Sequence, residues 1–306
     1  MFAQSRIFRY AALLVVLGLL FLPLPGNSLW WREVFNSGHV VLFAFLAAAI
    51  YYPLKATTRL SGSPVIYPAV LIVGLLLGGA TELLQGLVQR DASLDDLYGD
   101  IFGLLTGLSL IAAYDLKKLQ YKKAAAALLL VSIVFLSMGV SPLARLSWFY
   151  VERQNTFPVI MDFDADWSSR FVRFDKVDLL ERTEWGNTVY PVRFNPGEYP
   201  GISVIEPEPD WSGYRSLRLD VFSANKNGLI LVLRVHDDRH NQQFLDRFNM
   251  RLQIRPGMNE IDIPLRQIAL APRGRKMDMT NIAGVVLYMV GLNEPVELEI
   301  GNIFLE

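Results

Sequence analysis

Hydrophobic residues follow two different patterns along the 306-residue chain. Before residue 145 they form long continuous stretches, and after Pro142 they fall into short segments in which apolar and polar residues alternate. A stretch of about 20 apolar residues has the length of a helix that crosses a bilayer, whereas alternation with a period of two is typical of a half-buried strand. We therefore predict an α-helical transmembrane bundle over residues 1–144 and a C-terminal all-β jelly-roll sandwich over residues 145–306.

Five stretches of the first half have the composition of membrane-spanning helices. They are Phe8–Leu24, His39–Leu54, Val65–Val88, Leu97–Tyr114 and Ala124–Val140. No small-residue cleavage site follows the first stretch, so we interpret it as an anchor helix and not as a signal peptide.

Lysine and arginine accumulate at the cytoplasmic ends of membrane helices. One side of the predicted bundle holds most of these cations, namely Arg6, Arg9, Lys55, Arg59, Lys117, Lys118, Lys122 and Lys123, while the other holds Arg32 and Arg90. This distribution predicts a multi-pass protein of the cell (inner) membrane with a cytoplasmic N-terminus. An odd number of crossings then places the C-terminal domain in the extracytoplasmic or periplasmic space.

Polar side chains interrupt the third and fourth stretches. A charge at bilayer depth costs at least about 2.5 kcal/mol on insertion scales, so each requires a partner. We consider as a candidate site the set Glu82, Gln85, Arg90, Ser93, Asp96, Asp100 and His39. Asp96, Asp100, Gly103 and Gly107 lie on one helical stripe, where the glycines would let another helix approach closely. A buried network that fixes helix packing and a ligand or substrate site both remain open.

The stretch from Glu82 to Gly107 resembles the signature of the VanZ-like family of multi-helix membrane proteins. The matching positions are Glu82, Gln85, Arg90, Ser93, Asp96, Gly103 and Gly107, and Asp100 stands where asparagine is usual. The family's Asp-Lys pair before a histidine is replaced here by Phe35 and Asn36, ahead of His39. The resemblance covers residues 30–114 and implies an integral membrane protein of the cell envelope.

The second half shows strand patterns with turns between them. Alternating residues predict strands at Leu217–Val221, Leu229–Val235, Phe244–Met250 and Ile261–Ile263, with closing strands at Val285–Val290 and Val296–Leu305. The proline-rich stretch from Pro191 to Pro209 is interpreted as a long loop.

This half also resembles the galactose-binding-like jelly rolls, a group that includes carbohydrate-binding modules. The similar segments are Asp162–Trp167, Trp211–Val221, His236 with Asp237, Pro256–Leu265, Asp278–Tyr288 and Ile300–Leu305. The resemblance implies a sandwich fold and a saccharide ligand.

One sheet face of the second half carries candidate ligand-binding side chains. They are Arg234, His236, Arg247, Asn249 and Arg251. Three aromatic residues are candidate stacking platforms for a sugar: Trp185, Trp211 and Tyr214. The alternative is an ordinary solvated face with the tryptophans in the core.

Charge and composition narrow the function classes. Residues 1–144 carry 10 Lys and Arg and 7 Asp and Glu, and the remaining residues carry 19 and 23. The second half therefore has no basic excess, which argues against a nucleic-acid partner. The chain lacks cysteine, which excludes disulfides and thiolate chemistry. We interpret the run from His236 to His240 as a polar turn and expect no metal or other cofactor.

Three functions fit these features. The first is an envelope protein that acts on or senses a lipid-linked glycan, with an outer β domain that binds a saccharide, polysaccharide or partner protein. The second is a membrane enzyme or proton-coupled transporter that uses Glu82 or Asp96. The third is a structural anchor in the lipid bilayer with a docking domain for envelope proteins. No phosphate-binding glycine loop or hydrolase motif occurs, which argues against familiar soluble-enzyme chemistry. Whether the chain is an enzyme stays open.

Overall fold

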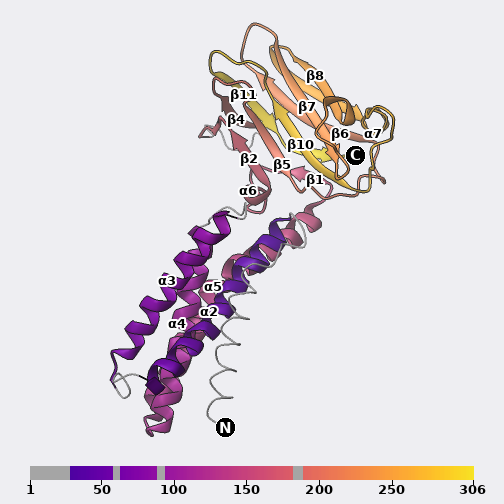
Figure 1. The fold of residues 1–306 in the computed structure, drawn as a ribbon. Helices are drawn as coiled ribbons and strands as arrows, with labels where there is room; N and C mark the ends of the chain where they lie inside the picture. The colour runs from indigo at the N-terminus through magenta and orange to yellow at the C-terminus, as the bar shows by residue number, and fades with distance from the viewer. Residues whose placement is uncertain (1–27, 58–62, 88–93, 182–188) are drawn as a thin grey trace. The chain divides into compact units, whose positions relative to one another are not determined.

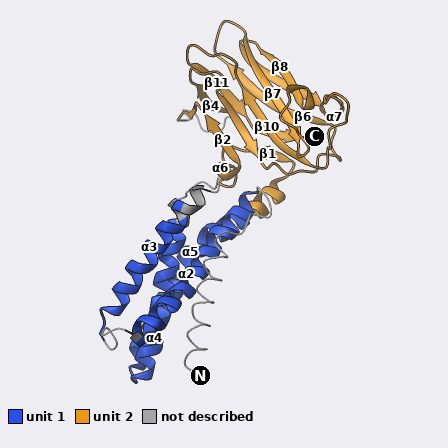
Figure 2. Cartoon of the chain, viewed as in Figure 1, with its two compact units in different colours: residues 1–147 blue, residues 148–306 orange. Residues whose placement is uncertain are grey.

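The computed structural model describes residues 28–57, 63–87, 94–181 and 189–306. The chain divides into two compact units, residues 1–147 and residues 148–306 (Figure 2). The first contains apolar helices and the second is a β-sandwich, so the two predicted classes of structure are both found.

Four long helices are described in the N-terminal part of the chain (Figure 1): α2 (Leu29–Thr57), α3 (Ile66–Leu87), α4 (Leu94–Lys118) and α5 (Lys122–Thr156). Within the described ranges, three segments are long and apolar enough to cross a membrane by length and composition: Leu29–Ala56, Leu97–Lys118 and Lys122–Thr156. The apolar part of α3, Ile66–Thr81, is shorter. The predicted helix at Phe8–Leu24 lies outside the described residues.

A stripe of glycines on α4 packs against the backbone of α2. A Cβ placed on Gly103 would lie 2.5 Å from the carbonyl oxygen of Val40. Gly99 faces the Asn36 carbonyl and Gly107 the Ala44 carbonyl in the same way. Successive glycines along α4 contact successive residues along α2 in the same direction, so the two helices run parallel. The prediction that Gly103 and Gly107 allow close helix approach is confirmed.

Helix α5 continues past the point where the sequence pattern changes. Pro142 lacks the N–H that would bond to the carbonyl of Met138, four residues earlier. The hydroxyl of Ser141 donates to that carbonyl instead, at 2.9 Å. The helix therefore runs through Pro142 to Thr156, past residue 145, where the predicted β domain begins.

The last turns of α5 belong to the packing of the β unit. Arg153 is buried, pairs with Glu208 at 3.2 Å and donates to the carbonyl of Glu206. Its guanidinium carbon lies 4.8 Å from the ring centroids of Tyr150 and Phe171. These contacts hold residues 148–156 in helical form beside the strands.

The β unit consists of two antiparallel sheets (Figure 1). The seven-stranded sheet has the order β1 (Val159–Met161), β12 (Ile303–Leu305), β6 (Ser216–Ser223), β11 (Val296–Gly301), β4 (Val189–Phe194) and β3 (Val177–Leu179), with β9 (Gly257–Pro264) paired to β6. The five-stranded sheet has the order β2 (Val172–Asp175), β5 (Gly201–Ile205), β10 (Ile282–Tyr288), β7 (Leu229–Asp237) and β8 (Phe248–Ile254). Short helices α6 (Ser168–Phe171), η1 (Phe244–Asp246) and α7 (Leu265–Ala269) lie between strands.

Alternation along the strands builds the core between the two sheets. Leu217, Leu219 and Val221 of β6 are fully buried, as is the Leu231, Leu233 and Val235 set of β7. The residues between them on β7 therefore point away from the core, toward the outer face of the five-stranded sheet.

Two predicted elements of the β unit are corrected. The stretch Pro191–Pro209 is not one loop, because it contains most of β4 and all of β5. Residues Phe244–Asp246 form the turn η1, and the strand begins only at Phe248.

Candidate ligand-binding site

Three neighbouring strands of the five-stranded sheet, β10, β7 and β8, carry a pocket of about 820 Å³. Arg234 on β7 is paired in register with Asn249 on β8 and with Val286 on β10. A second row of register partners lies two residues further along each strand and consists of Arg251, Val232 and Tyr288. Both rows line the pocket.

Loops at the strand ends complete the pocket. Tyr199 precedes β5, Val290 follows β10, and Phe244 and Arg247 precede β8. Tyr199 and Phe244 are exposed by 55% and 62%, which is high for aromatic side chains. Tyr199 and Tyr288 meet edge to face, with centroids 6.1 Å apart. The rim thus presents aromatic surface beside polar donors.

Three arginines line the pocket, and none of its lining residues is acidic. Arg247 donates through Nε to the Asn249 side-chain oxygen at 3.2 Å and lies 5.5 Å from the Phe244 ring centroid. The Nε of Arg234 is buried and has no hydrogen-bond partner among the described residues. Burial, followed by the nearby Arg247 cation, lowers the pKa of Arg234.

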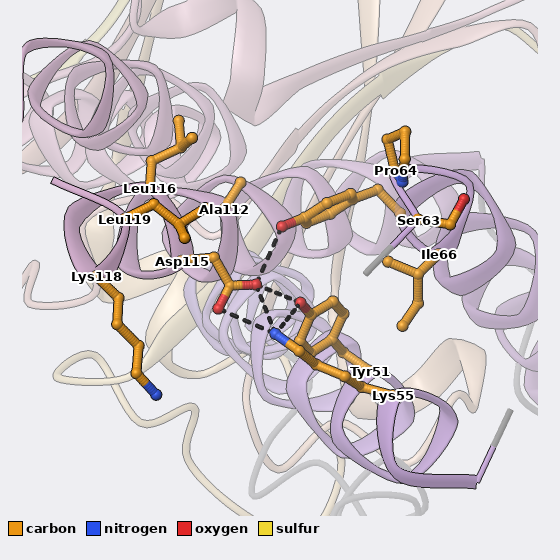
Figure 3. A pocket seen from close by; sticks show the side chains of 11 residues that line it. Tyr51, Lys55, Ser63, Pro64, Ile66, Ala112, Asp115, Leu116, Lys118 and Leu119 are labelled. Atoms are coloured by element: carbon orange, nitrogen blue, oxygen red, sulfur yellow. Dashed lines mark hydrogen bonds and ion pairs between the residues drawn. The ribbon is translucent and has the colours of Figure 1, made fainter. Parts of the chain in front are cut away.

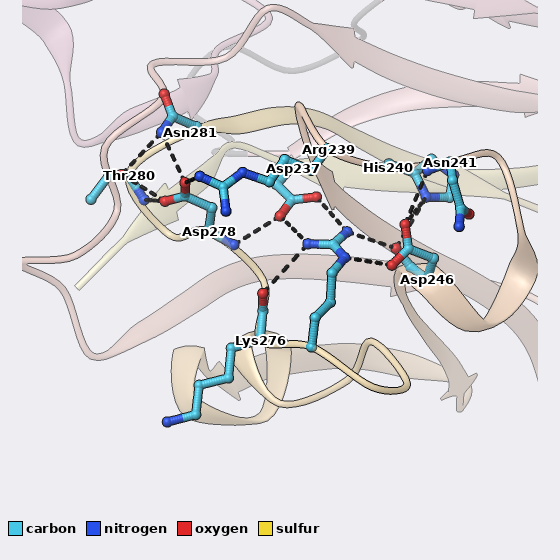
Figure 4. Close-up of polar contacts among 10 residues, drawn as sticks. Asp237, Arg239, His240, Asn241, Asp246, Lys276, Asp278, Thr280 and Asn281 are labelled. Atoms are coloured by element: carbon cyan, nitrogen blue, oxygen red, sulfur yellow. Dashed lines mark hydrogen bonds and ion pairs between the residues drawn. The ribbon is translucent and has the colours of Figure 1, made fainter.

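Arg275 holds the loop that carries Phe244 and Arg247 through Asp237 and Asp246, two acidic residues labelled in Figure 4. This guanidinium donates to both carboxylate oxygens of Asp237 at the end of β7. Its Nε donates to Asp246, which lies in the same loop, at 2.5 Å. Arg275 therefore fixes the 238–247 connection and acts as a positioning residue for the pocket.

His236 lies on the same strand face as Arg234 but does not line the pocket. Its ring occupies space left by Gly284 on β10, where a Cβ would be 2.5 Å from the imidazole Cε1. Burial, then the cations of Arg234 and neighbouring groups, lower the pKa of His236 to about 4. At neutral pH it is an uncharged packing residue.

The residues from His236 to His240, at the end of β7, have the composition of a metal-binding cluster. Asp237 and His240 instead bond to other residues of the β unit. Both oxygens of Asp237 accept from Arg275, and Oδ2 also accepts the backbone N–H of Asp278 at 2.8 Å. His240 bonds through Nδ1 with the backbone oxygen of Asp246 at 3.0 Å. Among the described residues, no group of three His, Cys, Asp or Glu is arranged to hold a metal ion.

The sequence-predicted aromatic platforms are not at this pocket. Trp211 is fully buried, and its indole donates to the Glu208 carbonyl at 2.8 Å, so it is a core residue and its assignment to ligand binding is corrected. Tyr214 packs edge to face on Phe157, with centroids 5.2 Å apart. Trp185 lies outside the described residues.

Two of the polar candidates in the helical unit are brought together. His39 Nδ1 on α2 and Asp100 Oδ1 on α4 are 2.9 Å apart and buried. Gly78 on α3 leaves room for Asp100, since a Cβ there would be 2.6 Å from Asp100 Oδ2. Glu82, Gln85, Arg90, Ser93 and Asp96 lie where the structure does not describe side chains.

A second pocket, of about 460 Å³, lies at the end of the helical unit where α2 and α4 terminate (Figure 3). Asp115 on α4 accepts hydrogen bonds from Tyr51, Lys55 and Tyr67. Lys55 also donates to the Tyr51 hydroxyl at 2.9 Å. These polar groups satisfy one another across three helices, so the arrangement is sufficient as a helix lock without a ligand.

No protein-family model matches this sequence, and no curated protein matches it, so the VanZ-like expectation gains no support from these comparisons. Solved structures do match. A family 11 carbohydrate-binding module from Clostridium thermocellum, in complex with a β-1,3-1,4-mixed-linked tetrasaccharide, is 16% identical with a TM-score of 0.37, over 48% of this chain and 93% of that one.

Two further structures are similar at the same level. An exo-β-agarase is 18% identical with a TM-score of 0.39, over 48% of this chain and 24% of that one. A family 30 carbohydrate-binding module of a cellulosomal cellulase of Clostridium thermocellum is 11% identical with a TM-score of 0.33, over 44% of this chain and 91% of that one.

Proposed function

We propose that the β unit binds a saccharide chain in the pocket on its five-stranded sheet, and that the apolar helices anchor it in a membrane. Saccharide binding is supported by one observation: aromatic rings and the hydrogen-bond donors of arginine and asparagine side chains line the same pocket. Sugar rings offer apolar faces for Tyr199, Phe244 and Tyr288. Their oxygen atoms accept hydrogen bonds from Arg234, Arg247 and Asn249.

The size of the pocket supports this proposal. A volume of about 820 Å³ falls in the range of roughly 300–1,000 Å³ that is usual for small-molecule sites. The side chains stand on β7, β8 and β10, whose pairing is continuous, so the site is held on a rigid frame. The donors are therefore pre-positioned, which reduces the entropy lost on binding.

A competing role for this face is docking of a partner protein. Partner interfaces are centred on buried apolar or aromatic anchors, whereas three arginines and an asparagine are among the residues that line this pocket. This set of side chains favours a polar ligand that enters the pocket.

Saccharide binding is tested with the full-length protein in detergent on a glycan array, followed by titration calorimetry on the best oligosaccharide. Phe244→Ala should weaken binding about tenfold, because stacking on an aromatic ring contributes about 1 kcal/mol or more beyond area burial. Leu270→Ala is the matched control, since Leu270 is also exposed in the β unit and does not line the pocket. If no glycan on the array binds, the proposal of saccharide binding is wrong.

The membrane part has its own test. The chain contains no cysteine, so Asn225→Cys in the exposed turn before β7 introduces one unique thiol. We propose an extracytoplasmic β unit, for which a membrane-impermeant maleimide labels this thiol in intact cells. Labelling only after lysis contradicts the proposed orientation. A VanZ-like activity of the helices stays a prediction and is not needed for either test.

A further inference from the structure

The arginines of the β unit differ in how their charges are compensated. Arg193 pairs with Glu297 at 2.7 Å, Arg218 with Asp262 at 3.3 Å, and Arg275 with Asp237 at 2.5 Å. Around the pocket the structure describes no such pair for Arg234, Arg247 or Arg251, although all three line one hollow. Cations therefore gather in this hollow without carboxylates.

This arrangement is unfavourable for a protein without a ligand. A guanidinium that leaves water needs a hydrogen-bonded counter-charge to offset the loss of hydration. Arg234 is partly buried, its Nε has no partner within the described residues, and Arg247 adds a like charge beside it. An anion placed between Arg234 and Arg247 would relieve both costs.

The geometry suits a small oxyanion in particular. Arg247 is oriented by Asn249 and by the Phe244 ring, so one edge of its guanidinium is already committed. Arg234 is the register partner of Asn249 on the next strand. The remaining N–H groups form the planar donor pattern that carboxylates and sulfates accept in bidentate fashion.

We propose that the saccharide bound in this pocket is acidic, with a carboxylate or sulfate group held by Arg234 and Arg247. This inference rests on the proposed saccharide-binding function and narrows its substrate class. Uronic-acid carboxylates and sulfate esters offer the same oxyanion chemistry, so the experiment separates them.

A lipid headgroup is the main competing source of an oxyanion, and the shape of the rim argues against it. Phe244 and Tyr199 are strongly exposed, whereas Arg234 and Arg247 lie deeper and are partly buried. A flat bilayer surface would meet the aromatic rim before its phosphates reached these arginines. One acidic ring of an extended sugar chain can enter the hollow between the aromatic side chains.

The experiment is calorimetry on full-length protein in neutral detergent with two matched pairs of probes. The first pair is a galacturonate oligomer and the same oligomer with methyl-esterified carboxyls. The second is a sulfated galactan oligosaccharide and its desulfated form. We expect at least one acidic probe to bind about tenfold or more tightly than its neutral counterpart, with affinity that falls as salt rises.

Substitutions assign the effect to the pocket. Arg234→Gln and Arg247→Gln should each lower acidic-probe affinity about tenfold and leave neutral-probe affinity nearly unchanged. Arg218→Gln removes the same charge from the other sheet and should change neither. An unchanged melting temperature for each variant shows that the pocket is still folded.

The outcomes separate the two proposals. Equal affinities within both pairs, unaffected by Arg234→Gln, overturn the acidic preference and leave saccharide binding standing. Failure of every saccharide to bind overturns both. Binding to phosphatidylglycerol vesicles that Arg234→Gln abolishes, without binding to either acidic probe, assigns the arginines to a lipid surface and overturns the inference.

Discussion

Arg275 holds Asp237 with two parallel hydrogen bonds, from Nη1 to Oδ2 at 2.5 Å and from Nη2 to Oδ1 at 2.8 Å. The Asp237 side chain is fully buried, while that of Arg275 remains partly exposed. The bidentate pair joins the loop before β10 to the end of β7, and through Asp246 it also holds the turn that leads into β8. Loop position at the pocket therefore depends on one guanidinium.

Replacing Arg275 by Ala should destabilise the β unit by about 3–5 kcal/mol, because it leaves the Asp237 carboxylate buried without a counter-charge. Thermal and chemical unfolding of the full-length protein in detergent, read by tryptophan fluorescence, measures the loss. Arg193→Ala is the control, since the Arg193–Glu297 pair is exposed and should contribute under about 1 kcal/mol. Equal losses of unfolding free energy in the two variants would show that the buried pair stabilises the β unit no more than the exposed pair.

Acidification should destabilise the β unit in two stages. Burial and nearby cations lower the pKa of His236 from 6.5 to about 4, so the unfolded chain takes up a proton before the folded one does. Stability therefore falls as pH drops from about 6.5 to about 4. The hydrogen bond from Arg275 lowers the pKa of Asp246 to about 2, and the contribution of Asp246 is lost as pH falls from about 4 toward 2.

His236→Gln isolates the first stage. The variant lacks the titrating group, so its melting temperature should stay nearly constant between pH 6.5 and pH 4, where that of the natural protein declines. The decline corresponds to about 2 kcal/mol, less than the full shift would give because the imidazole is only partly buried. Parallel pH profiles for the two proteins would assign the first stage to other groups.

The polar side chains of the pocket could be predicted from the sequence, and its aromatic side chains could not. Alternation on β7 and β8 placed Arg234, Asn249 and Arg251 on one face, because one buried side of a strand fixes the direction of the other. The aromatic rim was missed. Phe244 and Tyr199 lie in connections without periodicity, and their positions depend on tertiary contacts such as those of Arg275.

The wrong interpretations share a physical origin in local breaking residues. The hydrophobic pattern changes after Pro142 and predicts a loop from Pro191, yet both prolines lie inside regular elements. Ser141 supplies the hydrogen bond that Pro142 cannot make in α5, and Pro191 lies just beyond the last register pair of the short strand β3. Such compensation depends on one neighbour and gives no signal in a hydrophobic pattern.

In the helical unit, Asp115→Asn should lower the melting temperature of the full-length protein. The substitution removes the charge that accepts bonds from Tyr51, Lys55 and Tyr67, and so leaves an ammonium without its anion at a junction of three helices. Interhelical polar contacts contribute about 0.6 kcal/mol each, so the expected loss is about 1–2 kcal/mol. Lys118→Ala, in the same pocket, is the control and should have no effect. Equal losses would mean that Asp115 does not join the helices.

Two glycine-to-alanine substitutions in the helices should have opposite signs. At Gly103 the added methyl group would lie 2.5 Å from the Val40 carbonyl oxygen, which is backbone and cannot rotate away, so α2 and α4 must separate and the melting temperature should fall. At Gly79 on α3 no atom lies within 4 Å of the new methyl group. There alanine should stabilise by up to about 1 kcal/mol, through its higher helix propensity. Both variants are measured side by side in the same detergent. A fall of equal size in both would show that helix packing does not depend on the Gly103 contact, since of these two glycines Gly103 faces the α2 backbone and Gly79 does not.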